Sequence, residues 1–166
     1  MADPTTAPRP AERTTRRHCR IAVSADDLAA HFAVRRAVFC TEQAIFTTSD
    51  RDERDDDLAT LAVIGLAGAT VGGAVRLYPL DGDGLWKGDR LAVLPAYRRG
   101  LLGASLVRFA VRSAGDLGGA RMVAMIQAPN LHFFEWLGWE ADGSEREYRG
   151  VPHVPVTIGL SRQPGR

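Results

Sequence analysis

A chain of 166 residues with 45% apolar and 25% charged residues has the composition of an ordinary globular protein, long enough for one domain with a buried core. Its formal net charge of +1 argues against a general nucleic-acid binder. No apolar run approaches the roughly 20 residues of a membrane span, and the N-terminus lacks the apolar segment of a secretory signal. Two cysteines, Cys19 and Cys40, make no disulfide framework, so a reducing cytoplasm is expected.

Residues 1–18 are rich in proline, threonine and arginine and almost devoid of large apolar side chains, which predicts a disordered N-terminal tail. The basic run at 13–20 carries no interleaved aromatic residue, so a solvated tail is favoured over a nucleic-acid arm. The predicted organisation is completed by a single domain over 19–161 and a frayed end over 162–166.

The first half of the body predicts a strand, a helix and a hairpin. A short strand over 20–23 precedes a helix that Ser24 caps and that extends to about residue 40. An acidic loop follows at 50–57. Two apolar and β-branched runs, 60–66 and 70–78, lie on either side of Ala67-Gly68-Ala69 and predict a β-hairpin.

The second half predicts alternating strands and helices. In chain order these are a strand over 86–94, a helix over 102–117 ended by Gly118-Gly119, a strand over 122–128, a short aromatic helix over 131–137, and two strands over 139–160 with a turn near 150–152. The order as a whole predicts a mixed α/β fold, of the α+β class.

The segment between the strand at 86–94 and the helix at 102–117 predicts an anion site. A helix N-terminus leaves N–H groups unpaired and carries partial positive charge, so phosphate binds there. Arg98 and Arg99 add fixed charge with a geometry that suits phosphate oxygens. Gly100 and Gly103 allow a ligand to approach the backbone closely. The spacing fits neither a Walker loop nor a dinucleotide fingerprint.

The segment 98–103 resembles the pyrophosphate loop of the GNAT superfamily of N-acetyltransferases, Arg/Gln-x-x-Gly-x-Gly/Ala, with Leu101 where the first glycine is usual. The segment 130–139 is similar to the Asn…Phe-Tyr-x-x-x-Gly-Phe stretch that follows the fifth strand in that superfamily. The segment 36–46 resembles the Arg-x-x-Val-Phe-x-x-Glu-Gln helix of one branch, which also has an acidic patch and a late Gly-x-Pro-His, here 150–153. Within the branch, the likeness is greatest to bacterial acetyltransferases associated with nitrogen-starvation gene clusters.

The resemblance implies the GNAT fold, in which helices flank a central, mostly antiparallel sheet of six to seven strands that is splayed at the cofactor cleft. Acetyl-CoA would lay its pantetheine arm along one strand edge, place its pyrophosphate on the loop and helix start, and contact the segment after the fifth strand on its other side. The implied cofactor-binding residues are Leu91, Ala92, Val93, Arg98, Arg99, Gly100, Leu101, Leu102, Gly103, Ala104, Asn130 and Phe134. No metal is implied.

The implied chemistry is direct attack of an amine on the thioester, which needs a base for the ammonium and an acid for the thiolate. The candidate base is Glu42, because burial at a helix end facing a cleft favours the uncharged form of a carboxyl group, and His153 is the alternative. Each residue also has a structural interpretation, as an arginine partner and as a strand histidine respectively. The usual acid is a tyrosine, replaced here by Phe134; water, His132 or Tyr148 would then supply the proton.

The other residues with reactive or aromatic side chains are interpreted as structural. Cys40 lies in an apolar run and is interpreted as a small core residue rather than a nucleophile. The aromatic residues at 133–139 are interpreted chiefly as core packing. The acidic loop lacks the pattern of a calcium site, so it is interpreted as solvated or as attracting a cationic acceptor.

The sequence thus predicts a cytoplasmic acetyl-CoA-dependent N-acetyltransferase that acts on a small-molecule amine, binds no nucleic acid or membrane, and forms a homodimer. Two alternatives stay open: a non-catalytic CoA-binding regulatory module, and an acyltransferase related to the acylhomoserine lactone synthases.

Overall fold

The structure, a computed structural model, describes residues 16–80 and 82–161. Its strands form one sheet in the order β1-β2-β3-β4-β5-β8-β6, with β7 also paired to β8. The strands are β1 (Arg17–Ile21), β2 (Leu61–Ala67), β3 (Thr70–Pro79), β4 (Leu85–Val93), β5 (Arg121–Gln127), β6 (Glu140–Ala141), β7 (Arg146–Tyr148) and β8 (Val151–Gly159). Among these described strands only the β4–β5 pairing is parallel. The predicted mixed fold with an open, mostly antiparallel sheet is confirmed, and the two short strands β6 and β7 bring the strand number to eight.

The first helix begins where the sequence predicts. Ser24 caps α1 (Ala25–Arg36), its hydroxyl accepting a hydrogen bond from the Asp27 N–H at 3.1 Å. The helix then continues as a π-helical segment, η1 (Ala37–Glu42), in which the Gln43 N–H reaches the Val38 carbonyl at 2.9 Å. The wider turn at η1 is a difference from the single predicted helix.

The other helices and turns follow the predicted order. These helices are α2 (Leu102–Asp116) and α3 (Leu131–Trp136), with short 3-10 turns η2 (Glu53–Asp56), η3 (Pro95–Tyr97) and η4 (Ala128–Asn130). Gly68, Gly118 and Gly138 have positive φ angles of 63°, 89° and 90° at the ends of β2, α2 and α3. Glycine adopts this conformation without strain, which explains why the chain turns at these three places.

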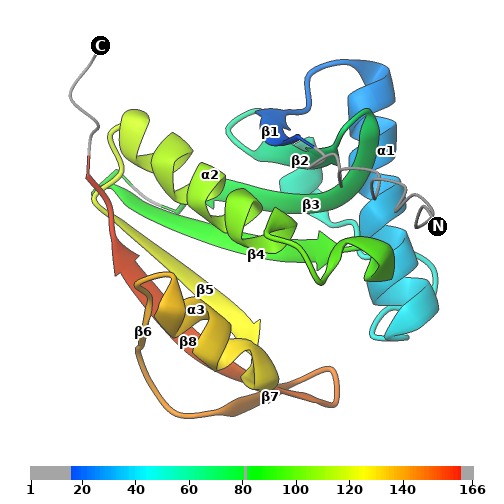
Figure 1. Cartoon of the computed structure of the whole chain (residues 1–166). Helices are drawn as coiled ribbons and strands as arrows, with labels where there is room; N and C mark the ends of the chain where they lie inside the picture. Colours follow the sequence, from blue (N-terminus) through cyan, green and yellow to red (C-terminus); the bar gives the residue numbers. More distant parts are fainter. Residues whose placement is uncertain (1–15, 81, 162–166) are drawn as a thin grey trace, which may run out of the picture.

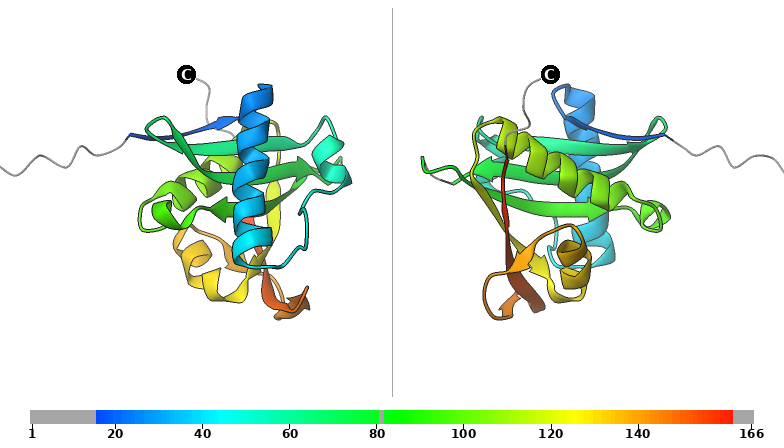
Figure 2. Two further views of the ribbon diagram at one scale, coloured as in Figure 1. Left: turned by 90° about the vertical axis from the view of Figure 1, so that its right-hand side faces the viewer. Right: turned by 60° about the vertical axis from the view of Figure 1, so that its left-hand side comes forward.

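Two helices cover opposite faces of the sheet (Figure 1, Figure 2). The apolar side of α2 packs on one face, in a core that includes Leu106, Leu77 and Met122. On the other face, α1 and η1 pack against β3 and β4 through Val34, Phe39 and neighbouring small residues. Side chains alternate between these faces along each strand, so a strand residue belongs to the α1 face or the α2 face.

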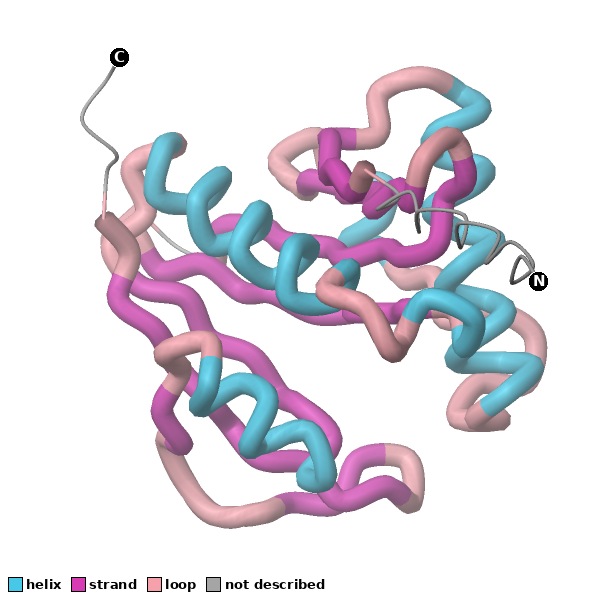
Figure 3. Tube along the Cα trace, in the orientation of Figure 1, coloured by secondary structure: helices cyan, strands magenta, loops and turns pink. Residues whose placement is uncertain are grey.

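The sheet is split at its centre. Strands β4 and β5 pair only over Leu85–Lys87 with Arg121–Val123, and beyond that point they diverge (Figure 3). Strands β5, β6, β7 and β8 and helix α3 lie on one side of the split, and β1 to β4 on the other. Both predicted functional segments, at 98–104 and at 130–139, border this opening.

Strand β1 begins at Arg17, before the predicted strand start at residue 20, because its main chain pairs with β2 from Arg17 opposite Ala67 onward. The last two residues of the predicted tail therefore lie in a strand. Residues 1–15 of that tail and the predicted frayed end, 162–166, lie outside the described residues. None of the described helices is long and apolar enough to cross a membrane.

Candidate active site

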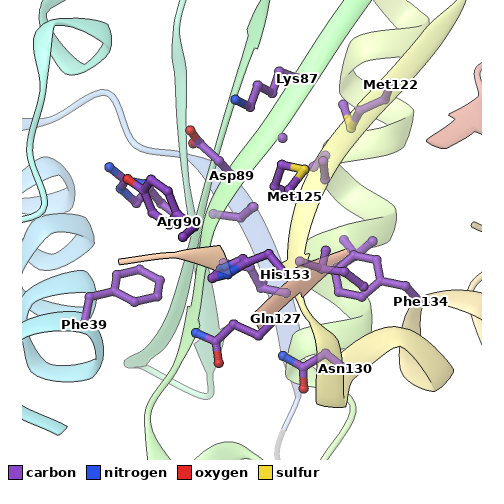
Figure 4. Close-up of a pocket in the computed structure, with 18 of the residues that line it drawn as sticks. Phe39, Lys87, Asp89, Arg90, Met122, Met125, Gln127, Asn130, Phe134 and His153 are labelled. Atoms are coloured by element: carbon purple, nitrogen blue, oxygen red, sulfur yellow. The ribbon is translucent and has the colours of Figure 1, made fainter. Parts of the chain in front are cut away.

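A cavity of about 370 Å³ occupies the split between β4 and β5. It is lined from both faces of the sheet (Figure 4): Phe39 and Arg90 lie on the α1 side, and Met122 and Phe134 lie on the α2 side. A molecule in this cavity therefore passes between the two halves of the sheet rather than lying on its surface.

The two sides of the cavity differ in chemistry. On the α1 side the lining holds most of the polar side chains, namely Gln43, Asp52, Tyr78, Lys87, Asp89, Gln127 and His153, beside the apolar side chains of Phe39, Ile45 and Phe46. On the α2 side it is apolar and consists largely of residues of the main core. Lys87, the only lysine of the chain, makes no ion pair with a described residue, unlike the carboxylates around it. The cavity thus joins a polar chamber to an apolar one.

Strand β4 carries a bulge at the cavity wall. Ala74 pairs with Ala92 and Arg76 with Asp89, so Val75 alone lies opposite Arg90 and Leu91. Arg90 has a φ of 52°, which is unfavourable for a residue with a side chain. A bulge leaves main-chain groups outside the ladder of hydrogen bonds. On the side of β4 that faces β5, main-chain groups beyond Lys87 have no strand partner among the described residues, since the two strands pair only up to that residue, and a ligand in the split can reach them.

A buried ionic network holds this bulge. Arg90 pairs with Asp50 at 3.1 Å and with Asp52 at 3.4 Å. Two further buried arginines complete the network: Arg35 with Asp50 and Asp55, and Arg76 with Asp52, Asp55 and Asp89, at 2.6–3.1 Å. Rather than being a solvated loop, the acidic segment supplies three carboxylates that these arginines neutralise. The electrostatic argument for a cationic acceptor accordingly loses its basis.

Asp55, one carboxylate of this network, stays ionised near neutral pH. Burial disfavours the charged form of Asp55, but hydrogen bonds and charge from Arg35 outweigh it and lower the pKa of Asp55 to about 2. Burial and the charge of Asp89 raise the pKa of Tyr78 to about 12, and the Tyr78 hydroxyl donates to Asp89 at 3.1 Å. No group of three His, Cys, Asp or Glu side chains in the described part of the chain is placed to hold a metal ion.

The predicted phosphate loop lies at one end of the split. The first N–H groups of α2 have no intrahelical acceptor, and no side chain caps this end. Leu101 is exposed here, whereas the side chains of Leu102 and Ala104 are buried in the core, which leaves only their main chain for a ligand. The Arg98 side chain folds back, its Nε–H donating to the Val93 carbonyl at 2.8 Å.

The cofactor-binding residues predicted on the strand at 86–94 and after the fifth strand do not all line the cavity. Leu91, Asn130 and Phe134 line the cavity. Ala92 instead packs on the α1 face, which leaves its main chain for a ligand, and Val93 packs against the main core. Phe134 packs edge to face against Trp139 at 5.6 Å between ring centroids, so it serves the core as well as the cavity wall.

The two candidate bases lie in different places. His153 lines the cavity and is buried; its Nδ1–H donates to the Val151 carbonyl at 2.8 Å if that tautomer is present, which leaves Nε2 as an acceptor. Glu42 lies at the end of η1, where it pairs with Arg98 at 2.5 Å. Tyr148 lines the cavity and contacts His153 edge to face, with 5.5 Å between ring centroids, whereas His132 is fully exposed and pairs with Glu135.

Several residues of the site had no predicted role. Asp89 and Arg90 line the polar chamber, and Arg76 pairs with Asp89 without lining it; Gly88 and Ala124 line the apolar chamber. A charged residue inside an apolar strand, as Arg76 is, indicates a buried ionic partner. The sequence therefore contained a signal for Arg76, whereas it contained none for the small residues Gly88 and Ala124.

The comparisons with known proteins agree with this arrangement. Residues 23–139 match the model of the acetyltransferase (GNAT) family. The chain is 28% identical over 138 residues to the uncharacterised N-acetyltransferase YjcF of Bacillus subtilis strain 168, covering 82% of this chain and 95% of that protein. A proposed N-acetyltransferase of Lactobacillus plantarum has a TM-score of 0.78 at 22% identity, over 87% of this chain and 98% of that one. The CoA-dependent acyl-homoserine lactone synthase BjaI, solved with SAM and isopentyl-CoA, has a TM-score of 0.71 at 22% identity, over 88% and 83%.

The fold and the site therefore define the class of the protein, an acyltransferase built on the N-acetyltransferase fold. The chain belongs to the acetyltransferase (GNAT) family, since the family model spans more than half of its length. The solved structures establish the shared fold alone. The likeness to the branch associated with nitrogen starvation stays a prediction.

Proposed function

We propose that the protein transfers the acetyl group of acetyl-CoA to a primary amine of a small molecule, within a ternary complex. The observation that carries the proposal is the cavity in the split sheet, which lies beside α2, a helix with an uncapped N-terminus, and holds a buried histidine on its polar side. Two ligands can approach such a cavity from opposite faces and meet within it.

Acetyl-CoA fits the α2 side. Its pyrophosphate would accept hydrogen bonds from the N–H groups at the start of α2 and from Arg98 and Arg99. Its pantetheine arm would pair with the main chain of β4 along Leu91–Val93, as an added strand. The thioester carbonyl would then lie at the bulge, where a free N–H can stabilise an oxyanion.

The amine would enter the polar chamber on the α1 side. Its nitrogen attacks the thioester carbon, so a C–N bond forms, the C–S bond breaks, and the CoA thiolate leaves and takes up a proton from water or from Tyr148. The ammonium proton passes to a base. His153 is the candidate that lines the cavity; Glu42 would have to part from Arg98 or act through it.

The test is release of free CoA thiol from acetyl-CoA in the presence of a panel of primary amines. His153→Ala should lower kcat about 100-fold or more, because general-base catalysis contributes at least that factor, while KM for acetyl-CoA changes little. Glu42→Gln tests the second candidate in the same way. His132→Ala, an exposed histidine outside the cavity, is the matched control and should leave kcat unchanged.

A variant that retains full turnover removes its residue from the mechanism. Binding of acetyl-CoA without acetylation of any amine in the panel would contradict the enzymatic proposal and support the regulatory CoA-binding alternative.

A further inference from the structure

The apolar chamber extends past the position proposed for the thioester. Its inner end, on the α2 side of the split, is lined by Val75, Gly88, Val107, Ala110, Met122 and Ala124. Met122 and Ala110 are 1% and 3% exposed and belong to the main core. Since protein cores are close-packed, a cavity that continues between core residues is space that the fold has left unfilled.

Small residues from three walls create this space. Gly88 comes from β4, Ala110 from α2 and Ala124 from β5. A Cβ built on Gly88 would have the Met122 sulfur at 3.4 Å and the Arg76 carbonyl oxygen at 4.0 Å as its nearest neighbours, which are ordinary contacts. The backbone therefore does not require glycine at position 88, and a side chain there would project into the chamber.

We infer that this inner end receives the acyl chain of the donor, so that the protein accepts CoA thioesters of short straight-chain fatty acids, of about four to six carbons, as well as acetyl-CoA. The inference rests on the proposed function, which positions the thioester at Leu91. Gly88 lies three residues earlier on β4, which is about 10 Å at roughly 3.3 Å per residue. An acetyl methyl group occupies only the start of that length.

The chemistry of the two chambers indicates which ligand each of them would hold. An amine acceptor at the inner end would bury its ammonium among apolar side chains, which is costly. An acyl chain there only removes apolar surface from water. The polar chamber, with Lys87, Asp89 and His153, is left for the acceptor. The acyl chain takes no part in bond making, and the transfer step is unchanged.

The test is calorimetric titration of the intact protein with CoA, acetyl-CoA, butyryl-CoA and hexanoyl-CoA. Each buried methylene should tighten binding by up to about four-fold, so hexanoyl-CoA should bind at least ten-fold more tightly than acetyl-CoA. Equal or weaker binding of the longer thioesters would overturn the inference and leave the proposed function intact. No binding of any thioester would contradict the proposed function itself.

Two variants distinguish the inner end from adventitious binding of an apolar chain. Gly88→Val and Ala124→Val fill the chamber from different strands and should retain acetyl-CoA binding within about three-fold while abolishing the gain for hexanoyl-CoA. Gly159→Val is the matched control, because a Cβ there meets no atom within 4 Å, and it should keep the gain. If both folded chamber variants keep the gain, the chain binds elsewhere. If neither variant folds, the chain-length series of the intact protein decides.

Discussion

Arg35 and Arg76 lie in an environment that their neighbours in the sequence do not predict. Both guanidinium groups are essentially inaccessible to solvent, yet each contacts two or more carboxylates. Their partners lie 13 to 24 residues away in the chain. Hydrophobic periodicity identifies strands and helices, but it carries no information on which distant carboxylate a buried arginine meets. The position of Arg76 in an apolar strand therefore indicates a buried ion pair, but the sequence does not predict which carboxylates take part in it.

The candidate site shows the same limit. Leu91, Asn130, Phe134 and His153 were found through motifs, and all four line the cavity. Glu42 was found in the same way, and it contacts Arg98 at the mouth of the phosphate loop instead. Which helix-end side chain faces the cavity depends on the π-helical turn of η1, which rotates the residues that follow it.

His31 makes stability depend on pH. It is fully buried; its Nδ1 lies 3.0 Å from the Val63 carbonyl and its Nε2 lies 3.2 Å from the Arg35 guanidinium. Burial lowers the pKa of His31 from 6.5 to about 4. Because the folded pKa is depressed, the unfolded chain takes up the proton first, so the free energy of unfolding falls as the pH drops from 6.5 to 4. The expected loss from this residue is about 3 kcal/mol.

Urea unfolding at pH 7.0 and pH 4.5 measures this dependence. His31→Gln keeps a polar side chain without a titrating group, and it should reduce the difference between the two pH values by at least half. An unchanged pH dependence in the variant would show that the proton is taken up elsewhere.

At the scale of elements, the predicted helices and long strands are confirmed within a few residues at either end. Local signals sufficed for these boundaries: the Ser24 cap of α1, the glycine after α2, and the hairpin at Gly68. Two irregularities escaped prediction, the π-helical η1 and the bulge at Arg90. The bulge is held by ion pairs with Asp50 and Asp52, which lie 40 and 38 residues away in sequence, so no local pattern could reveal it.

The end of α2 offers a test of how these elements pack. A Cβ on Gly119 would lie 2.7 Å from Trp86 and Leu160 side-chain atoms and 2.8 Å from the Ala114 carbonyl oxygen. Gly119→Ala should therefore lower the free energy of unfolding by about 2 kcal/mol, in the range for overpacking. Gly82→Ala, where a Cβ meets nothing within 4 Å, should leave it within about 0.5 kcal/mol. Chemical denaturation measures both, and equal stabilities of the two variants would contradict the close packing.

At the scale of the molecule, the split between β4 and β5 provides the cavity in which an acyltransferase of this fold can hold its substrates. Helix α2 presents its N-terminus to one face of the opening, and α1 with its ionic network closes the polar chamber on the other. The two helices thus separate the proposed donor from the proposed acceptor. The family supplies the fold, and the residues within the split decide which substrates it serves.

Calorimetric titration with acetyl-CoA, of the intact protein and of an Arg98→Ala/Arg99→Ala variant, tests this account most directly. We predict micromolar binding to the intact protein and at least ten-fold weaker binding to the variant, because charged hydrogen bonds to phosphate are worth about 1.5–3 kcal/mol each. Undiminished binding to the variant would contradict the assignment of the phosphate loop. An intact protein that binds no acetyl-CoA would contradict the central claim that this member of the family uses a CoA thioester.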